Sequence, residues 1–265
     1  GVRGINFKPD GKIMYITSRL GNENAFVVQY SLSTPFDIST ATRSFSDGDG
    51  TQLTCSTNMK LPHAIEFKPD GTKMFVATNK DFSGNPGVAI FQFRLNTAWD
   101  SSTLVCEKIY EVTETGVYVE NQLRTLAFKP DGTRMFVGGK NTDKIRQFDL
   151  SNAWDLRSGV TPGEISGSLA TSDTSMRNIQ FNSDGTALYI AGDTNARMNK
   201  YTLSTAYDIT TLSSTFSTFD LGSRVNDMRG FIFAANFTKL FVTSDGETSA
   251  TTDKIHEYDL QCAGT

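Results

Sequence analysis

The chain has 265 residues, of which 38% are hydrophobic and 20% charged, and its formal net charge is −4. This mildly acidic balance does not fit a nucleic-acid-binding protein, and no apolar run approaches the roughly 18 residues that a membrane-spanning helix needs. We therefore expect no nucleic-acid partner and no membrane insertion. A chain of this length can bury a sizeable core.

One sequence pattern occurs five times. An extended run ends in a phenylalanine, a turn of the type Pro-Asp-Gly follows, and a second apolar run begins soon after it. We call these five residues the anchor phenylalanines: Phe7, Phe67, Phe128, Phe181 and Phe233. They lie 60, 61, 53 and 52 residues apart. A period of this size indicates supersecondary units that pack side by side.

Each repeat is predicted to contain four strands in the same order. The first strand ends at the anchor, and the Pro-Asp-Gly turn leads into a second strand with three consecutive apolar residues, which fits a strand covered on both faces. The third strand alternates apolar and polar residues, as over residues 27–32. The fourth strands are the least regular and are predicted over residues 41–46, 104–112, 164–169 and 214–221.

An aromatic-Asp pair precedes each of these fourth strands. The pairs are Phe36-Asp37, Trp99-Asp100, Trp154-Asp155 and Tyr207-Asp208. We expect the aromatic rings to fill the space between neighbouring sheets and the aspartates to accept hydrogen bonds from turn amides. The fifth repeat has no such pair after Leu260 and no fourth strand. Because an open sheet edge invites docking, we expect flanking sequence of a longer polypeptide, or another chain, to complete it.

These elements predict an all-β fold, a β-propeller of five four-stranded antiparallel blades in which the last blade is incomplete. The whole chain, residues 1–265, is expected to form this single domain. The expected blades are residues 1–59, 60–120, 121–173, 174–225 and 226–265.

The repeats also resemble a known group of propellers. Residues 64–77, in which Pro-Asp-Gly precedes Met-Phe-Val, are similar to the propeller repeats of the surface-layer and WD-like superfamily. The aromatic-Asp turn resembles repeats common in surface and virion proteins of marine bacteria and their phages. The resemblance covers nearly the whole chain and implies an extracellular, cell-surface or virion module for binding or attachment. The fold alone does not specify a function.

A basic residue stands four positions before every anchor phenylalanine. We call this set the basic ring: Arg3, His63, Arg124, Arg177 and Arg229. Because the first strand of each blade lines the channel of a propeller, these side chains are expected at equal depth. They are interpreted either as an anion-binding site or as locks that pair with carboxylates of neighbouring blades, such as Asp193 and Asp245. The even spacing of the basic residue and the anchor favours the locks.

Candidate catalytic residues are few. The position just before the anchors holds one acid in five, in the series Asn6, Glu66, Ala127, Gln180 and Ile232. A glycosidase needs two carboxylates, and the two histidines lie on different strand types, so no Ser-His-Asp set is expected. Glu66, Asn178 and Asp227 loosely resemble the Glu, Asn and Asp with which lactonase-type propellers hold a divalent metal. Residues 47–50, Asp-Gly-Asp-Gly, lack the EF-hand spacing and are expected to form a plain turn.

The spacing of the three cysteines does not indicate a set of disulfide bonds. Cys55, Cys106 and Cys262 stand at unrelated positions of the repeats, and we expect incidental or buried thiols instead of disulfides or a zinc site.

The sequence therefore predicts a non-catalytic recognition or structural module, and not an enzyme. Its loops between second and third strands are rich in amide and hydroxyl side chains, which suit a polar or anionic glycan, with a protein receptor or other subunits as further partners. No cofactor is expected, and calcium is the alternative. Two other functions stay open: a metal-dependent hydrolase or lactonase at the channel mouth, and a purely architectural assembly domain.

Overall fold

The computed structural model describes most of the chain. The described residues are 1–20, 24–44, 50–55, 59–80, 88–112, 120, 122–167, 169, 175–192, 197–222, 225, 227–244 and 253–260. Apart from three single-turn 3-10 helices (Ile38–Thr40, Ser101–Thr103 and Ile209–Thr211), the regular elements among them are strands. Within this part of the chain, we find no helix with the length and apolar character needed to cross a membrane.

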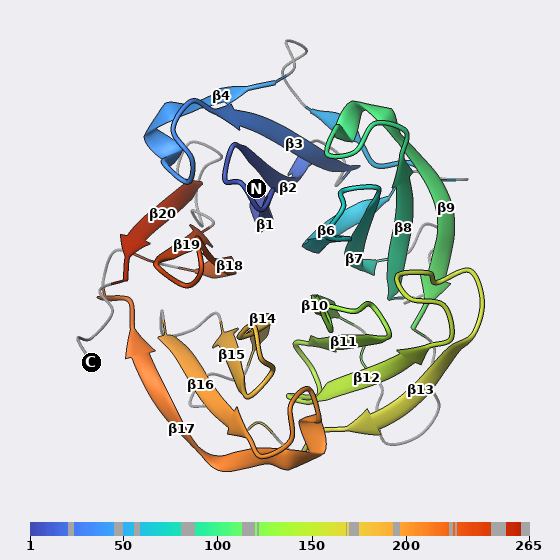
Figure 1. The fold of residues 1–265 in the computed structure, drawn as a ribbon, viewed down its shortest axis with the longest axis vertical. Coiled ribbons are helices and arrows are strands. Elements are labelled where there is room, and N and C mark those ends of the chain that lie inside the picture. Colours follow the sequence, from blue (N-terminus) through green and yellow to red (C-terminus); the bar gives the residue numbers. More distant parts are fainter. Residues whose placement is uncertain are drawn as a thin grey trace.

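The strands pair with their sequence neighbours, from an inner strand beside the central opening to an outer strand at the rim (Figure 1). The first unit contains β1 (Val2–Phe7), β2 (Ile13–Leu20), β3 (Asn24–Leu32) and β4 (Ala41–Arg43), with β5 (Thr51–Gln52) also paired to β3. The second contains β6 (Lys60–Phe67), β7 (Lys73–Lys80), β8 (Ala89–Leu95) and β9 (Leu104–Glu111). A single residue pair, Asn24 with Lys60, joins these two units into one nine-stranded sheet.

The remaining units are separate sheets. The third contains β10 (Leu123–Phe128), β11 (Arg134–Gly139), β12 (Ile145–Leu150) and β13 (Val160–Ile165). The fourth contains β14 (Met176–Phe181), β15 (Ala187–Gly192), β16 (Arg197–Leu203) and β17 (Leu212–Asp220). The fifth has three described strands, β18 (Met228–Ala234), β19 (Lys239–Ser244) and β20 (Lys254–Asp259).

The units stand around a common centre, with β1, β6, β10, β14 and β18 innermost (Figure 1). The last unit packs directly against the first, because β1 contacts β18 and β19 and the Thr243 hydroxyl donates to the Arg3 carbonyl at 2.5 Å. This arrangement confirms the predicted all-β propeller.

One outer strand begins earlier than predicted. The fourth strand of the third unit was expected over residues 164–169, but β13 spans Val160–Ile165. Its turn has no 3-10 helix: Gly159 adopts a φ of 68°, and Leu150 pairs with Val160 directly after it. Pro162 within β13 is tolerated because this strand lies at the edge of its sheet.

The anchor phenylalanines hold neighbouring units together. Each ring packs on an aromatic residue from the second strand of the preceding unit, and the first anchor packs on the last unit. The pairs and their centroid distances are Tyr15–Phe67 at 4.4 Å, Phe75–Phe128 at 4.7 Å, Phe136–Phe181 at 4.7 Å, Tyr189–Phe233 at 4.5 Å and Phe241–Phe7 at 4.6 Å. The apolar cores therefore lie between the blades.

The aromatic residues of the aromatic-Asp turns pack on the anchor phenylalanines between the units, as predicted. Trp154 has a φ of 60° and stacks on Phe128 at 4.7 Å, directly over the turn glycine Gly132. A Cβ on Gly132 would lie 2.0 Å from the indole, and the glycine has a φ of 74°, so both space and conformation require glycine. Three of the aspartates accept a hydrogen bond from the second residue of the following 3-10 helix: Asp37, Asp100 and Asp208.

In the fifth hairpin, a single residue both adopts the positive φ of the turn and packs on the anchor. Phe237 occupies the position of the turn glycine with a φ of 63°, and its ring stacks on the anchor Phe233 at 4.8 Å. It therefore replaces both the glycine and the aromatic residue of the other units.

The expectation of incidental thiols was wrong for two cysteines. Cys55 and Cys106 form a disulfide with a Cα–Cα distance of 5.3 Å, and it joins the rim of the first unit to β9 of the second. The prediction compared equivalent positions of the repeats, whereas this bond joins non-equivalent positions on adjacent rims. Cys262 lies outside the described residues.

Candidate functional site

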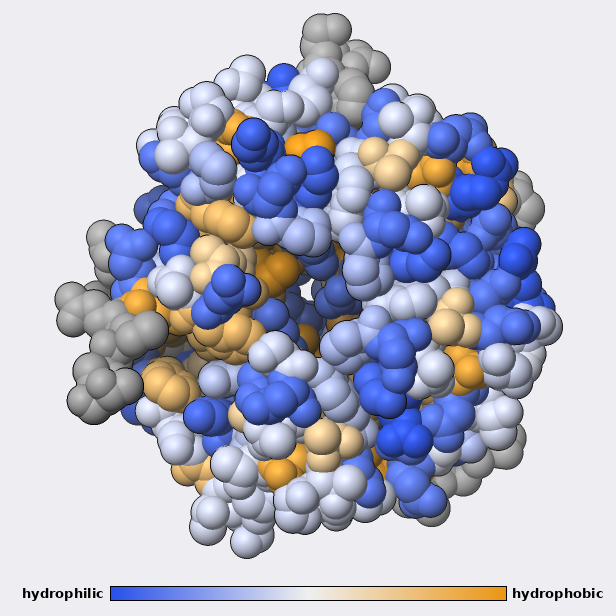
Figure 2. Space-filling view, viewed as in Figure 1, coloured by the Kyte–Doolittle hydropathy of each residue, from blue (hydrophilic) through white to orange (hydrophobic). Residues whose placement is uncertain are grey.

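The inner strands present alternate side chains to the channel and to the spaces between blades. The anchor phenylalanines pack between blades, so the residue just before each anchor lies on the opposite face, toward the channel. These channel residues are Asn6, Glu66, Ala127, Gln180 and Ile232. Figure 2 shows the opening at the centre of the molecule.

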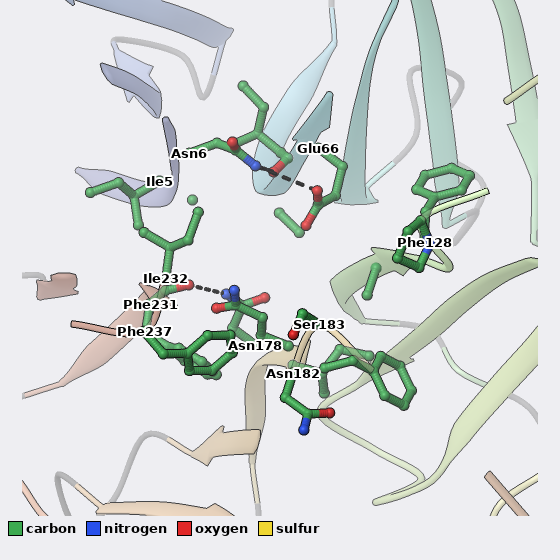
Figure 3. A pocket seen from close by; sticks show the side chains of 18 of the residues that line it. Ile5, Asn6, Glu66, Phe128, Asn178, Asn182, Ser183, Phe231, Ile232 and Phe237 are labelled. Atoms are coloured by element: carbon green, nitrogen blue, oxygen red, sulfur yellow. Dashed lines mark hydrogen bonds between the residues drawn. The ribbon is translucent and has the colours of Figure 1, made fainter. Parts of the chain in front are cut away.

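A cavity of about 300 Å³ lies at the end of the channel that the hairpin turns form. All five channel residues line it, and so do the turn residues Pro130, Asn182 and Ser183. Its volume falls at the lower end of the range of small-molecule sites. Figure 3 shows Asn6 and Glu66 directed toward one another, with Asn178 facing them from the fourth unit.

Glu66 is the one acidic residue among the described residues that line this cavity. Its Oε2 accepts a hydrogen bond of 3.4 Å from Asn6 Nδ2, which also donates to the Ile65 carbonyl at 3.0 Å. Burial in the wall raises the pKa of Glu66 to about 8, against the smaller lowering effect of the Asn6 hydrogen bond. A carboxyl group that changes charge near neutral pH is suited to proton transfer.

Two amide side chains on β14 fix the neighbouring unit. Asn178 Nδ2 donates to the Phe231 carbonyl at 2.7 Å. Gln180 makes two hydrogen bonds with the backbone of Phe233, donating to its carbonyl at 3.1 Å and accepting from its N–H at 2.7 Å. These bonds hold the fourth and fifth inner strands at fixed positions, so this part of the cavity wall is preorganised.

The fifth unit gives the cavity an apolar side. Ile232 stands where the first unit has Asn6, and Phe231 and Phe237 line the cavity beside it (Figure 3). The cavity therefore combines a polar wall around Glu66 with an apolar wall from the fifth unit.

The proposed metal set does not come together. Glu66 and Asn178 both line the cavity, but Asp227 does not. Its Oδ1 lies 3.5 Å from Arg177 Nη2 and its Oδ2 accepts a hydrogen bond from Arg229. Calcium takes six to eight oxygen ligands, and a cavity with one carboxylate does not fit it. In the described part of the chain, no three His, Cys, Asp or Glu side chains are grouped to hold a metal ion. Most of the Asp-Gly-Asp-Gly turn, residues 47–49, is not described.

The basic ring lies one residue deeper than the cavity. Gly4, Ala64 and Asn178 line the cavity, and each directly follows a residue of the ring. Four of its members are less than a tenth exposed: Arg3, His63, Arg124 and Arg177. Arg177 and Arg229 share Asp227, a contact between the fourth and fifth units. The partners that the sequence predicted, Asp193 and Asp245, lie outside the described residues.

The directions of these basic side chains could not be predicted from the sequence. Each inner strand has an irregular register at the basic position, as between Met176 and Asn178 in β14. Such a bulge inserts an extra residue and redirects side chains. The even spacing that placed the basic residue on the face of the anchor therefore does not apply here.

Solved structures with this fold include several lactonases. A proposed 6-phosphogluconolactonase from Bacteroides fragilis superposes with a TM-score of 0.53 at 16% identity, over 97% of this chain and 67% of that one. The periplasmic gluconolactonase of Pseudomonas aeruginosa gives 0.52 at 13% identity, over 98% and 69%. The calcium-binding protein regucalcin from Agrobacterium tumefaciens gives 0.51 at 11% identity, over 94% and 84%. No protein-family model and no curated protein matches the chain.

These likenesses show the propeller fold. The chain spans about two thirds of the length of the two lactonases. None of the three names a surface-layer or virion protein, so that context has no support beyond the repeat resemblance.

The expectation that the chain is not an enzyme is corrected by the same findings. It depended on the absence of a catalytic set, yet two of these propellers are described as enzymes that act on lactones.

Proposed function

We propose that the protein hydrolyses a small lactone in the cavity beside Glu66. The observation that supports this function is a lone carboxyl group, held by Asn6 in a cavity of about 300 Å³, in a fold shared by proteins that are named as lactonases. The apolar wall around Ile232 favours a lactone with an apolar substituent over one that is polar on all sides.

The chemistry needs one group that exchanges a proton twice. Ionised Glu66 takes a proton from a water molecule as its oxygen attacks the lactone carbonyl carbon. The ring C–O bond then breaks, and the carboxyl group of Glu66 returns the proton to the leaving oxygen. The product is a hydroxy acid, and its new carboxyl group ionises in water. A pKa of about 8 suits both steps near neutral pH.

The metal-dependent form of this reaction is not part of the proposal. Asp227 is bound to two arginines, and the described wall of the cavity offers one carboxylate. We therefore assign both proton transfers to Glu66, and expect hydrolysis to persist in a chelator.

The test measures hydrolysis of a panel of γ- and δ-lactones, with and without alkyl substituents, between pH 6 and 9. We expect kcat/KM to rise with pH through about 8, because the base must be ionised. Glu66→Gln should lower it about 10²–10⁴-fold, the usual contribution of a general base. Glu164→Gln, an exposed site on β13, is the matched control and should retain full activity.

Two outcomes would reject this function. Wild-type protein that hydrolyses no lactone of the panel above the buffer rate contradicts the reaction class. A Glu66→Gln variant with the wild-type rate and pH profile contradicts the role of Glu66.

We further propose that the protein works outside the cytoplasm, in the periplasm or the extracellular space. The Cys55–Cys106 disulfide supports this location, since such bonds persist in oxidising compartments. Mass spectrometry of the protein from its native compartment should find this pair oxidised, and a reduced pair would contradict the location.

A further inference from the structure

The residue two positions before each member of the basic ring is acidic in one unit of five. These positions hold Gly1, Leu61, Gln122, Ser175 and Asp227. Asp227 lies between two units, 3.5 Å from Arg177 of the fourth and hydrogen-bonded to Arg229 of the fifth. The channel thus contains one example of how its arginines hold a carboxylate.

Gln122 takes the equivalent place in the third unit. Its Oε1 accepts a hydrogen bond of 2.9 Å from Arg124 Nη2, as Asp227 accepts one from Arg229. The hydrogen bond is therefore retained, but the amide brings no negative charge. The guanidinium of Arg124 has no carboxylate from this position.

Arg124 has further hydrogen-bonding capacity that the protein does not use. The side chain is 7% exposed, and its Nε and Nη1 are buried without a hydrogen-bond partner. The adjacent hydroxyl of Thr125 is buried without a partner as well. A guanidinium stays protonated at all ordinary pH values, so Arg124 keeps its charge although it is buried. A buried, incompletely bonded cation is unfavourable and calls for an anion.

The groups around Arg124 include both signs of charge. Glu120 Oε1 accepts a hydrogen bond of 2.8 Å from the Gln122 N–H, and Arg177 of the next unit is already paired with Asp227. The inner strand β10 contacts β6 on one side and β14 on the other, which places the ring positions of His63 and Arg177 in the units that flank it. Figure 2 shows an opening at the centre of the propeller, and this is the route by which we expect an anion to enter the channel.

We propose that Arg124 binds a small oxyanion, such as inorganic phosphate, in the inner layer of the channel. The oxyanion takes the role at the third unit that Asp227 has between the fourth and fifth units. Its oxygens accept hydrogen bonds from Nε and Nη1, and the planar guanidinium suits such a partner. This site does not depend on the proposed hydrolysis, because binding of phosphate involves no turnover.

The experiment follows thermal unfolding and isothermal titration with inorganic phosphate, against sodium chloride at matched ionic strength. We expect a saturable rise of Tm with phosphate, because a ligand that binds the folded state stabilises it. Acetate in a parallel titration tests whether a carboxylate is also accepted.

Two variants locate the site. Arg124→Gln should weaken phosphate binding at least tenfold. Gln122→Glu supplies the missing carboxylate beside Arg124, so it should raise Tm in the absence of phosphate and remove the phosphate-dependent rise. Arg197→Gln, on the exposed outer part of the fourth unit, is the control and should bind phosphate as the wild type does.

The possible results distinguish phosphate binding by Arg124 from a purely structural role of this residue. A wild-type Tm that does not respond to phosphate overturns the proposal. So does a response that is equal in wild type and Gln122→Glu, which would indicate a general salt effect. If Arg124→Gln does not fold, the Gln122→Glu comparison still decides the question.

Discussion

Neighbouring residues of the same inner strands belong to two different layers. In the anchor layer, every unit has a phenylalanine packed on an aromatic ring of the unit before it. In the channel layer, one residue earlier, the five units have five different side chains. Packing between blades imposes the same requirement on every unit, whereas the channel residues differ from unit to unit and include a single acid, Glu66. The repeated residues therefore belong to the scaffold, and the differing residues form the site that we propose.

The largest effect expected in the anchor layer concerns Phe136, which is fully buried and packs on Phe181. Phe136→Ala should lower the free energy of unfolding by about 4 kcal/mol, through lost burial and a cavity between blades. Denaturant unfolding measures this loss. Below the transition, the pH profile of hydrolysis should stay unchanged; a shifted profile would show that the two layers are not separable.

Much of the anchor layer could be predicted from sequence because its signal is repeated. The phenylalanines, the turn glycines and the aromatic-Asp pairs recur at nearly constant spacing, and each repetition supports the same interpretation. The residues of the channel layer are harder to predict from the sequence, because they do not recur from unit to unit. Glu66 is the only acid of its series, but burial is what raises its pKa, and burial cannot be read from the spacing of the repeats.

Other features depend on three-dimensional neighbours that periodicity does not identify. The disulfide joins Cys55 and Cys106 across two rims, 51 residues apart. The bulges at the basic ring are visible only when two strands are paired. The pairing of Asp227 with two arginines removed it from the metal set, although its residue type fitted.

The next largest effect concerns this disulfide at the rim. Replacing both Cys55 and Cys106 with serine should lower the free energy of unfolding by about 3 kcal/mol, because the unfolded chain loses a cross-link around a long loop. The comparison is made under oxidising conditions by chemical denaturation. An unchanged stability would mean that the bond is not formed in the protein studied.

For the channel layer, the sign of the effect on stability is the distinguishing observation. The folded state keeps the Glu66 proton up to about pH 8, whereas the unfolded chain loses it near pH 4.5. Stability attributable to this group therefore falls as pH rises from 4.5 to 8. Glu66→Gln should be more stable than wild type at pH 9, with the difference vanishing below pH 4. A variant less stable than wild type at pH 9 would contradict the burial of this carboxyl group.

The smallest effect concerns the apolar wall. Ile232→Asn gives the fifth unit the channel residue of the first, and it should change stability by less than about 1 kcal/mol because the side chain is partly exposed. For a lactone with an alkyl substituent, KM should rise about tenfold, with little change for an unsubstituted lactone. Steady-state kinetics on both substrates measures this, and equal effects on the two would argue against substituent recognition.

Because of the disulfide, the junctions between neighbouring units of the propeller differ in mechanical strength. The first and second units are tied by a covalent bond, whereas the first and last meet through side-chain packing and hydrogen bonds such as that from Thr243. Under tension or partial denaturant, the circle should separate at this junction between its two chain ends, and the tied pair should be the last to come apart.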